Sequence, residues 1–136
     1  MPTRISDLHI AREDLLPTPR EVHADLPAGE AEAAHIARAR ATVQAILRGE
    51  DDRLLVITGP CSIHEAESAI EYARRLRDFS SGVSDALYPV MRVYFEKPRT
   101  RMGWKGLIYD PDLDGRGDIG AGLRRARRIL LACARL

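Results

Sequence analysis

Five cationic side chains fall between Arg92 and Lys105. Elsewhere the chain carries its positive charge on arginine, since only two of its 21 Lys and Arg residues are lysines and both, Lys97 and Lys105, lie in this stretch. A lysine ammonium is a compact charge and an arginine guanidinium is a planar fork, so the two are not interchangeable where a defined anion is bound. The cluster predicts a site for anionic ligands, against the alternative that the two lysines lie together by chance on a solvated loop.

Arg92 lies within an apolar, strand-like run. The two-residue period of a strand places it on one face with Val90 and Tyr94, so we expect it to point toward a largely apolar wall. A buried charge without a partner is costly. Arg92 therefore requires either an anionic ligand or an internal salt bridge with an acidic residue such as Glu96 or Asp110.

Lys97 and Arg99 flank Pro98, whose ring fixes the local backbone. Together with Arg92, these cations could bind two anions, such as a phosphate and a carboxylate. Small anionic ligands suit the sequence better than nucleic acid does, because the net charge is only +1 and aromatic residues make up 5% of the chain.

Cys61 follows the apolar run 54–58 and the Gly-Pro break after it. Ser62 and Glu65 have the spacing of a capping box, which predicts a helix that begins there and continues to about Phe79. A helix N-terminus beside Cys61 would favour its thiolate, which binds metals and attacks electrophiles. The alternative is a small buried cysteine that fills the corner between strand and helix.

The elements that position these residues follow from apolar periodicity. We expect a helix over 30–48, a strand over 54–58 that is buried on both faces, a second strand over about 87–95, a long polar loop and a helix from about 119 to 130. This order is that of a parallel α/β fold, in which ligands bind at the carboxyl ends of strands. Residues 1–28 contain four prolines and read as an arm with at most one short helical turn. The arginines of the last helix are expected on its solvated face.

The length of 136 residues predicts one domain. The sequence contains no apolar stretch long enough to span a bilayer and no signal-peptide pattern, so we expect a cytoplasmic protein without a membrane partner. Its two cysteines, Cys61 and Cys133, lie far apart and form no disulfide framework or metal-finger spacing, which agrees with a reducing compartment.

Three segments, LLVITGPCSIH, MRVYFEKPRT and GWKGLIYDPDLDG, resemble the class I, feedback-regulated 3-deoxy-D-arabino-heptulosonate 7-phosphate (DAHP) synthases, and the resemblance runs from about Leu15 to Leu131. It implies a (β/α)8 TIM barrel preceded by an arm, and an enzyme that condenses phosphoenolpyruvate with erythrose 4-phosphate in the first step of aromatic amino acid biosynthesis. It also implies a divalent metal of the Mn, Fe, Co or Zn class.

The resemblance assigns roles residue by residue. Cys61 would be a metal ligand, and Arg92 and Lys97 would contact phosphoenolpyruvate, with Lys97 as the catalytic residue. Arg99 and Thr100 would hold the phosphate of erythrose 4-phosphate. These roles agree with the two-anion site that charge and strand position predict.

The sequence departs from the family in one respect. The family's remaining metal ligands, a His, a Glu and an Asp, lie on later strands and have no counterpart in these 136 residues. We therefore expect a truncated α/β fold with an arm over 1–28 and a partial barrel domain over 29–136. We expect the chain alone to be inactive as a synthase and to form homo-oligomers. The alternative is a non-catalytic module that binds a phosphorylated metabolite or pairs with a full-length synthase.

Overall fold

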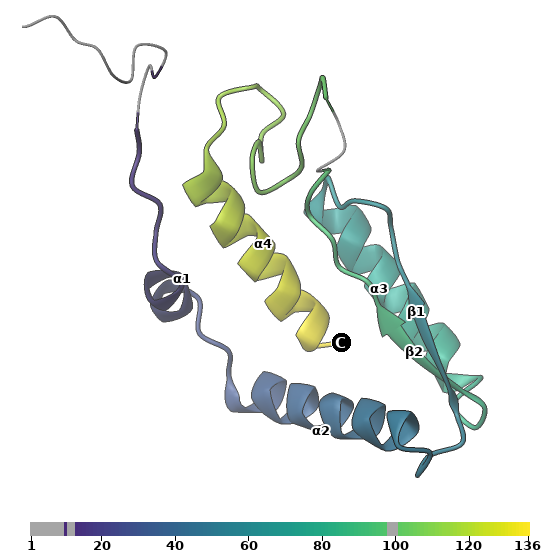
Figure 1. The fold of residues 1–136 in the computed structure, drawn as a ribbon. Helices are drawn as coiled ribbons and strands as arrows, with labels where there is room; N and C mark the ends of the chain where they lie inside the picture. Colours follow the sequence, from purple (N-terminus) through teal and green to yellow (C-terminus); the bar gives the residue numbers. More distant parts are fainter. Residues whose placement is uncertain (1–9, 11–12, 98–100) are drawn as a thin grey trace, which may run out of the picture.

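The computed structural model describes residues 10, 13–97 and 101–136 of the chain. Figure 1 shows the elements in the order α1 (Pro19–Asp25), α2 (Glu30–Leu47), β1 (Leu54–Thr58), α3 (Ala66–Ser81), β2 (Leu87–Met91) and α4 (Ile119–Ala134). The predicted α/β class and the β-α-β-loop-α order are confirmed. In the described part of the chain, no helix is both long and apolar enough to cross a membrane.

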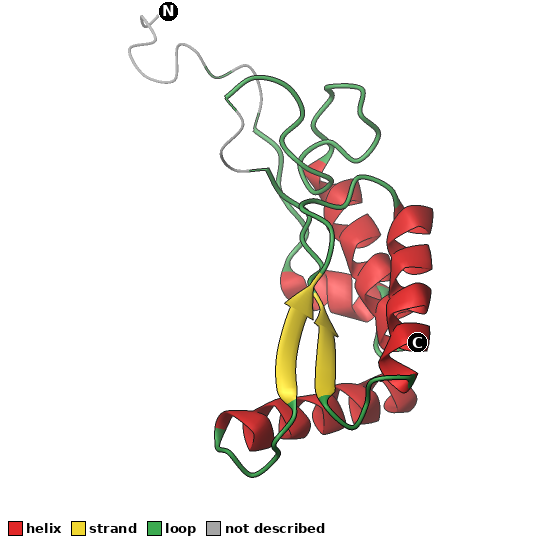
Figure 2. Cartoon of the chain, turned by 90° about the vertical axis from the view of Figure 1, so that its right-hand side faces the viewer, coloured by secondary structure: helices red, strands yellow, loops and turns green. Residues whose placement is uncertain are grey.

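The two strands pair in parallel, with Leu54 opposite Leu87 and Thr58 opposite Met91. Two expectations about them were wrong. The second strand ends at Met91 instead of Phe95, so Arg92 follows the strand, and β1 is not buried on both faces, since Leu54 and Ile57 are 64% and 66% exposed. The reason is visible in Figure 2, where the helices lie to one side of the strands and across one end of them, which leaves much of the sheet uncovered.

The capping box predicted at Ser62 and Glu65 does not form. Glu65 is itself the N-cap of α3 and makes no side-chain cap bond, and the helix runs on to Ser81. The chain remains non-helical before Glu65 because the N–H of Ile63 donates to the carbonyl of Tyr94 at 2.7 Å, and this pairing inserts the Ile63 side chain, 2% exposed, into the core. The hydroxyl of Ser62 is buried without a hydrogen-bond partner in the described structure.

The core joins α3, α4 and the segments that follow the two strands. Its buried members are Ile63, Ala69, Phe95, Leu107, Ala126 and Ile129. Leu107 is fully buried although it belongs to the segment expected to be a long polar loop. That segment is therefore anchored to the core at its centre, between its two strongly polar ends.

The arginines of α4 do not form the solvated face expected of them. Arg124 pairs with Asp25 of the α1 region at 3.0 Å, Arg127 donates to the carbonyl of Leu26 at 3.1 Å, and Arg125 pairs with Asp112 at 2.7 Å. Arg128 remains exposed. Figure 1 shows α1 beside α4, so these arginines attach the arm and the preceding loop to the last helix.

Candidate functional site

The site begins where the two parallel strands end. The N–H of Arg92 donates to the carbonyl of Thr58 at 2.7 Å, which continues the strand pairing one residue beyond β2. Gly59 permits this approach, because a Cβ at that position would overlap the carbonyl oxygen of Arg92. The Gly-Pro-Cys loop after β1 therefore lies directly against the segment that carries the predicted cations.

The guanidinium of Arg92 is held by backbone carbonyls. Its Nη1 donates to the carbonyl oxygens of Pro60 at 2.6 Å and Cys61 at 2.9 Å, and the group lies over the ring of Tyr94, 4.4 Å from the centroid. Neither Glu96 nor Asp110 pairs with it, so the internal salt bridge is not formed. The side chain is half-buried and fixed, but its charge is not neutralised by any carboxylate of the described residues.

One edge of this guanidinium is available to a ligand. Nε and Nη2 of Arg92 make no hydrogen bond within the described residues, and these two nitrogens form the side-on edge that binds carboxylate or phosphate with two parallel bonds. Arg53 in the same chain uses this edge, with Nε and Nη2 donating to Asp51 at 2.9 and 2.6 Å. Those bonds, together with one from the backbone N–H of Arg53, lower the pKa of Asp51 to about 2.

Lys97 is brought near Lys105 by a short antiparallel pairing. Glu96 bridges Gly106, and the N–H of Lys97 donates to the carbonyl of Lys105 at 2.9 Å. Gly106 has φ of 122°, and a Cβ there would overlap the carbonyl of Phe95, so the pairing depends on glycine. The Lys97 side chain is exposed. Arg99 and Thr100 lie outside the described residues.

Cys61 is exposed and lies four residues before the N-cap of α3, so it does not sit at a helix start as expected. Its carbonyl, rather than its thiol, is what contacts Arg92. In the described ranges no three His, Cys, Asp or Glu side chains gather as a metal site would require. The thiol alone does not fit a complete metal centre.

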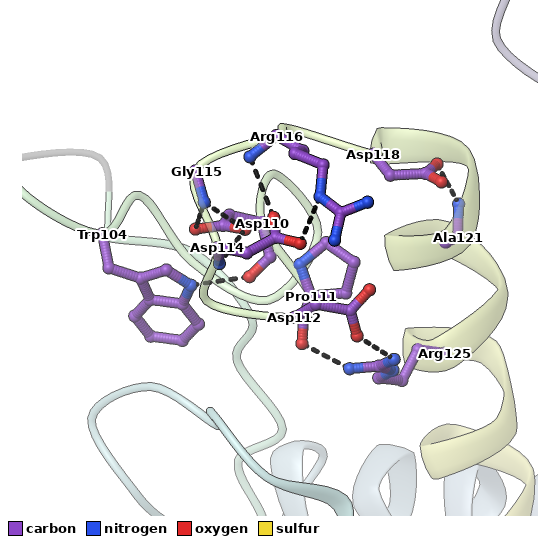
Figure 3. Close-up of polar contacts among 10 residues, drawn as sticks. All are labelled: Trp104, Asp110, Pro111, Asp112, Asp114, Gly115, Arg116, Asp118, Ala121 and Arg125. Atoms are coloured by element: carbon purple, nitrogen blue, oxygen red, sulfur yellow. Dashed lines mark hydrogen bonds and ion pairs between the residues drawn. The ribbon is translucent and has the colours of Figure 1, made fainter.

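Asp110 and Asp114, two aspartates of the segment 110–118, stabilise the loop before α4 (Figure 3). The carboxylate of Asp110 accepts the backbone N–H groups of Asp114 and Gly115 at 3.2 Å, and its carbonyl accepts Nε1–H of Trp104 at 2.7 Å. Asp114 accepts the backbone N–H of Arg116 and pairs with its guanidinium at 2.6 Å, and both interactions lower the pKa of Asp114. Sequence reasoning missed this loop structure, although Asp spaced by two before glycine is a signal for Asx turns.

We expect Gly59→Ala to destabilise the chain by about 1–3 kcal/mol, because the added methyl must push apart the backbones at Gly59 and Arg92. Urea denaturation followed by far-UV circular dichroism measures the change. Gly82→Ala is the matched control, since a Cβ there would be 3.6 Å from the carbonyl of Phe79, an ordinary contact. Equal effects of the two substitutions would show that the contact at Gly59 is not tight.

The sequence of the chain is similar to those of known proteins. The sequence profile of the DAHP synthetase I family matches residues 28–131. The Tyr-sensitive phospho-2-dehydro-3-deoxyheptonate aldolase of Escherichia coli K12 is 52% identical over 93% of this chain and 36% of its own length. The phospho-2-dehydro-3-deoxyheptonate aldolase of Amycolatopsis methanolica is 51% identical over 84% of this chain and 56% of its own length.

A solved structure shares the fold. The phospho-2-dehydro-3-deoxyheptonate aldolase of Francisella tularensis SCHU S4 superposes with a TM-score of 0.86 at 41% identity, over 92% of this chain and 37% of that one. The chain thus spans little more than a third of the length of these E. coli and Francisella relatives. Because the profile covers most of the chain and the relatives align over nearly all of it, the chain belongs to the DAHP synthetase I family.

Proposed function

We propose that the chain is the N-terminal part of a DAHP synthase, with residues 1–28 as an arm and residues 29–136 as the first units of a (β/α)8 barrel. The complete enzyme condenses phosphoenolpyruvate with erythrose 4-phosphate, the first step of aromatic amino acid biosynthesis. The identity to relatives named as phospho-2-dehydro-3-deoxyheptonate aldolases supports this over the non-catalytic module that the sequence also allowed.

The observation that carries the proposal is the anchored guanidinium of Arg92. Two carbonyls fix its Nη1 and leave the Nε and Nη2 edge for an anion, at the strand ends where α/β folds bind ligands. Phosphoenolpyruvate offers both a phosphate and a carboxylate to such an edge. Binding would also neutralise a half-buried charge that no described carboxylate balances.

Lys97 is proposed as the second contact of phosphoenolpyruvate and as the catalytic residue. Its exposed ammonium follows the short Glu96–Gly106 bridge, which fixes its backbone relative to the core. From this position the ammonium would stabilise the negative charge of the bound phosphate and carboxylate. Arg99 and Thr100 are proposed to hold the phosphate of erythrose 4-phosphate.

Cys61 is proposed as one ligand of a divalent metal of the Mn, Fe, Co or Zn class. An exposed thiol next to the Arg92 anchor has the chemistry for this role. The described residues supply no further cluster of ligands, so a metal centre requires side chains from elsewhere.

The chain alone is expected to bind phosphoenolpyruvate without turning it over. Calorimetry with phosphoenolpyruvate measures the first, and phosphate release with both substrates and Mn²⁺ measures the second. The physical reason is that the strand-end cations Arg92 and Lys97 are present, while the described residues gather no complete set of metal ligands. Repeated turnover by the purified chain would contradict the fragment assignment, and absence of phosphoenolpyruvate binding by the folded chain would contradict the role of Arg92.

A further inference from the structure

The guanidinium of Arg92 has an aromatic neighbour to which the proposed function assigns no role. Its Cζ lies over the ring of Tyr94, 4.4 Å from the centroid, inside the ~6 Å within which a cation is attracted to the face of an aromatic ring. The hydrogen bonds of the guanidinium to the carbonyls of Pro60 and Cys61 both act on Nη1, at one end of the group. A tilt about that end displaces the edge formed by Nε and Nη2, and the ring restrains this tilt by contact from one side.

The backbone fixes the ring relative to Arg92. The N–H of Arg92 donates to the carbonyl of Thr58, and the carbonyl of Tyr94 accepts the N–H of Ile63, both at 2.7 Å. Side chains two residues apart share a face where the chain runs like a strand, which agrees with the contact between Arg92 and the ring. Ile63 and Phe95, the residue after Tyr94, are buried in the core. The ring is therefore carried by a segment that is tied to β1 and to the core.

The ring of Tyr94 is in use in the described structure, and its hydroxyl is not. Within the described residues the Tyr94 hydroxyl makes no hydrogen bond, whereas the hydroxyl of Tyr72 pairs with that of Thr58 at 3.1 Å. The Tyr94 side chain is half-buried. Phenylalanine at this position would keep the contact with Arg92, and an aliphatic side chain would remove it.

A second arginine–tyrosine pair, at the opposite end of the strands, provides a contrast. Arg53 lies over the ring of Tyr88, 5.1 Å from the centroid, but its Nε and Nη2 donate to the carboxylate of Asp51. A carboxylate neutralises a guanidinium and occupies the donors that a ligand needs. A ring stabilises the charge through its negative face and occupies no N–H donor of the bidentate edge. Since no carboxylate of the described residues pairs with Arg92, the ring and the two carbonyls hold it with that edge open.

We propose that Tyr94 is a positioning residue of the anion site. Its ring holds the guanidinium of Arg92 so that the edge formed by Nε and Nη2 is presented before the ligand arrives. Ordering a mobile side chain during association weakens affinity, and a preformed arrangement avoids that loss. The proposal rests on the proposed function, in which this edge receives the phosphate or carboxylate of phosphoenolpyruvate, and it adds a residue that acts through Arg92.

Calorimetry of phosphoenolpyruvate binding to the whole chain tests this role. Tyr94→Leu is expected to weaken binding about threefold to tenfold, the effect of having to order one side chain on association. Tyr94→Phe is expected to stay within about twofold of the wild type, because it keeps the ring. Tyr88→Leu is the matched control. It removes the ring beside Arg53, whose charge Asp51 already neutralises, and is expected to leave the affinity unchanged.

Relaxation of the ¹⁵N-labelled Arg92 Nε–H group measures positioning without a ligand, and so separates it from a general structural role. The signal is identified by its loss in Arg92→Lys. Its order parameter is expected to approach the value of about 0.85 that marks a rigid group in the wild type and in Tyr94→Phe, and to fall below about 0.6 in Tyr94→Leu. Urea denaturation verifies that the variants are folded. A mobile Nε–H in the folded wild-type chain would overturn the proposal, even if Tyr94→Leu failed to fold.

The two measurements distinguish failure of this proposal from failure of the proposed function. If folded Tyr94→Leu binds phosphoenolpyruvate as tightly as the wild type, or if Tyr94→Phe or Tyr88→Leu weakens binding as much as Tyr94→Leu does, the ring does not position Arg92 and this proposal is wrong. If the wild-type chain has a rigid Arg92 Nε–H but does not bind phosphoenolpyruvate, the proposed ligand is wrong, and the positioning of the edge by Tyr94 is still supported.

Discussion

Replacing Arg92 with alanine is expected to weaken phosphoenolpyruvate binding roughly tenfold to a hundredfold, as measured by calorimetry. The estimate follows from the loss of charge-assisted hydrogen bonds, which contribute about 1.5–3 kcal/mol. The substitution removes the free Nε and Nη2 edge, and it also removes the two bonds from Nη1 to Pro60 and Cys61. The loop that carries Cys61 would therefore lose an anchor together with the ligand contact.

Arg92→Lys separates these two contributions. A lysine retains the charge and can donate to the carbonyls, but it cannot stack as a planar group on Tyr94. It also cannot bind an anion through two parallel, bidentate hydrogen bonds while it donates to the carbonyls. We therefore expect it to recover little of the affinity. Arg128→Ala, which removes an exposed arginine of α4, is the control for net charge. If Arg128→Ala weakens binding as much as Arg92→Ala does, general electrostatic attraction and not a built site accounts for the affinity.

The elements that depend on local pattern were predictable. The helix α2 was placed to within one residue and β1 exactly, because a helical stripe ending near glycine and a short apolar run before Gly-Pro are signals contained in the elements themselves. The start of α3 was wrong for a different reason. Ser62 and Glu65 have the right spacing for a cap, but the bond from Ile63 to Tyr94, more than thirty residues away, holds this segment out of the helix. Residue spacing within the segment 62–65 cannot predict a contact with a residue so far away in the sequence.

The candidate site was predictable as a set of charges but not as a geometry. An arginine within an apolar run and two lysines together in an arginine-rich chain indicated an anion site. The partners of Arg92 are backbone carbonyls of Pro60 and Cys61, and such atoms have no signature in sequence. A sequence predicts side-chain partners such as Glu96 and Asp110, whereas the positions of backbone carbonyls depend on the fold.

The largest effect on stability is expected at Leu107. Its side chain is fully buried in the segment between β2 and α4, and it packs with Phe95 and Ile129. Leu107→Ala leaves a cavity among these residues, and substitutions of this kind cost about 2–5 kcal/mol. Its backbone N–H also donates to the carbonyl of Phe95 at 2.8 Å, next to the bridge that positions Lys97, so a shift at Leu107 would reach the cation cluster.

The control is Leu113→Ala, in the same loop but with its side chain 59% exposed. A surface truncation of this kind is expected to change the free energy of unfolding by no more than about 0.5 kcal/mol. Urea denaturation of the three proteins measures both values. If Leu107→Ala costs as little as Leu113→Ala, the loop is not anchored in the core, and the fixed position of Lys97 that the proposed function requires would lose its physical basis.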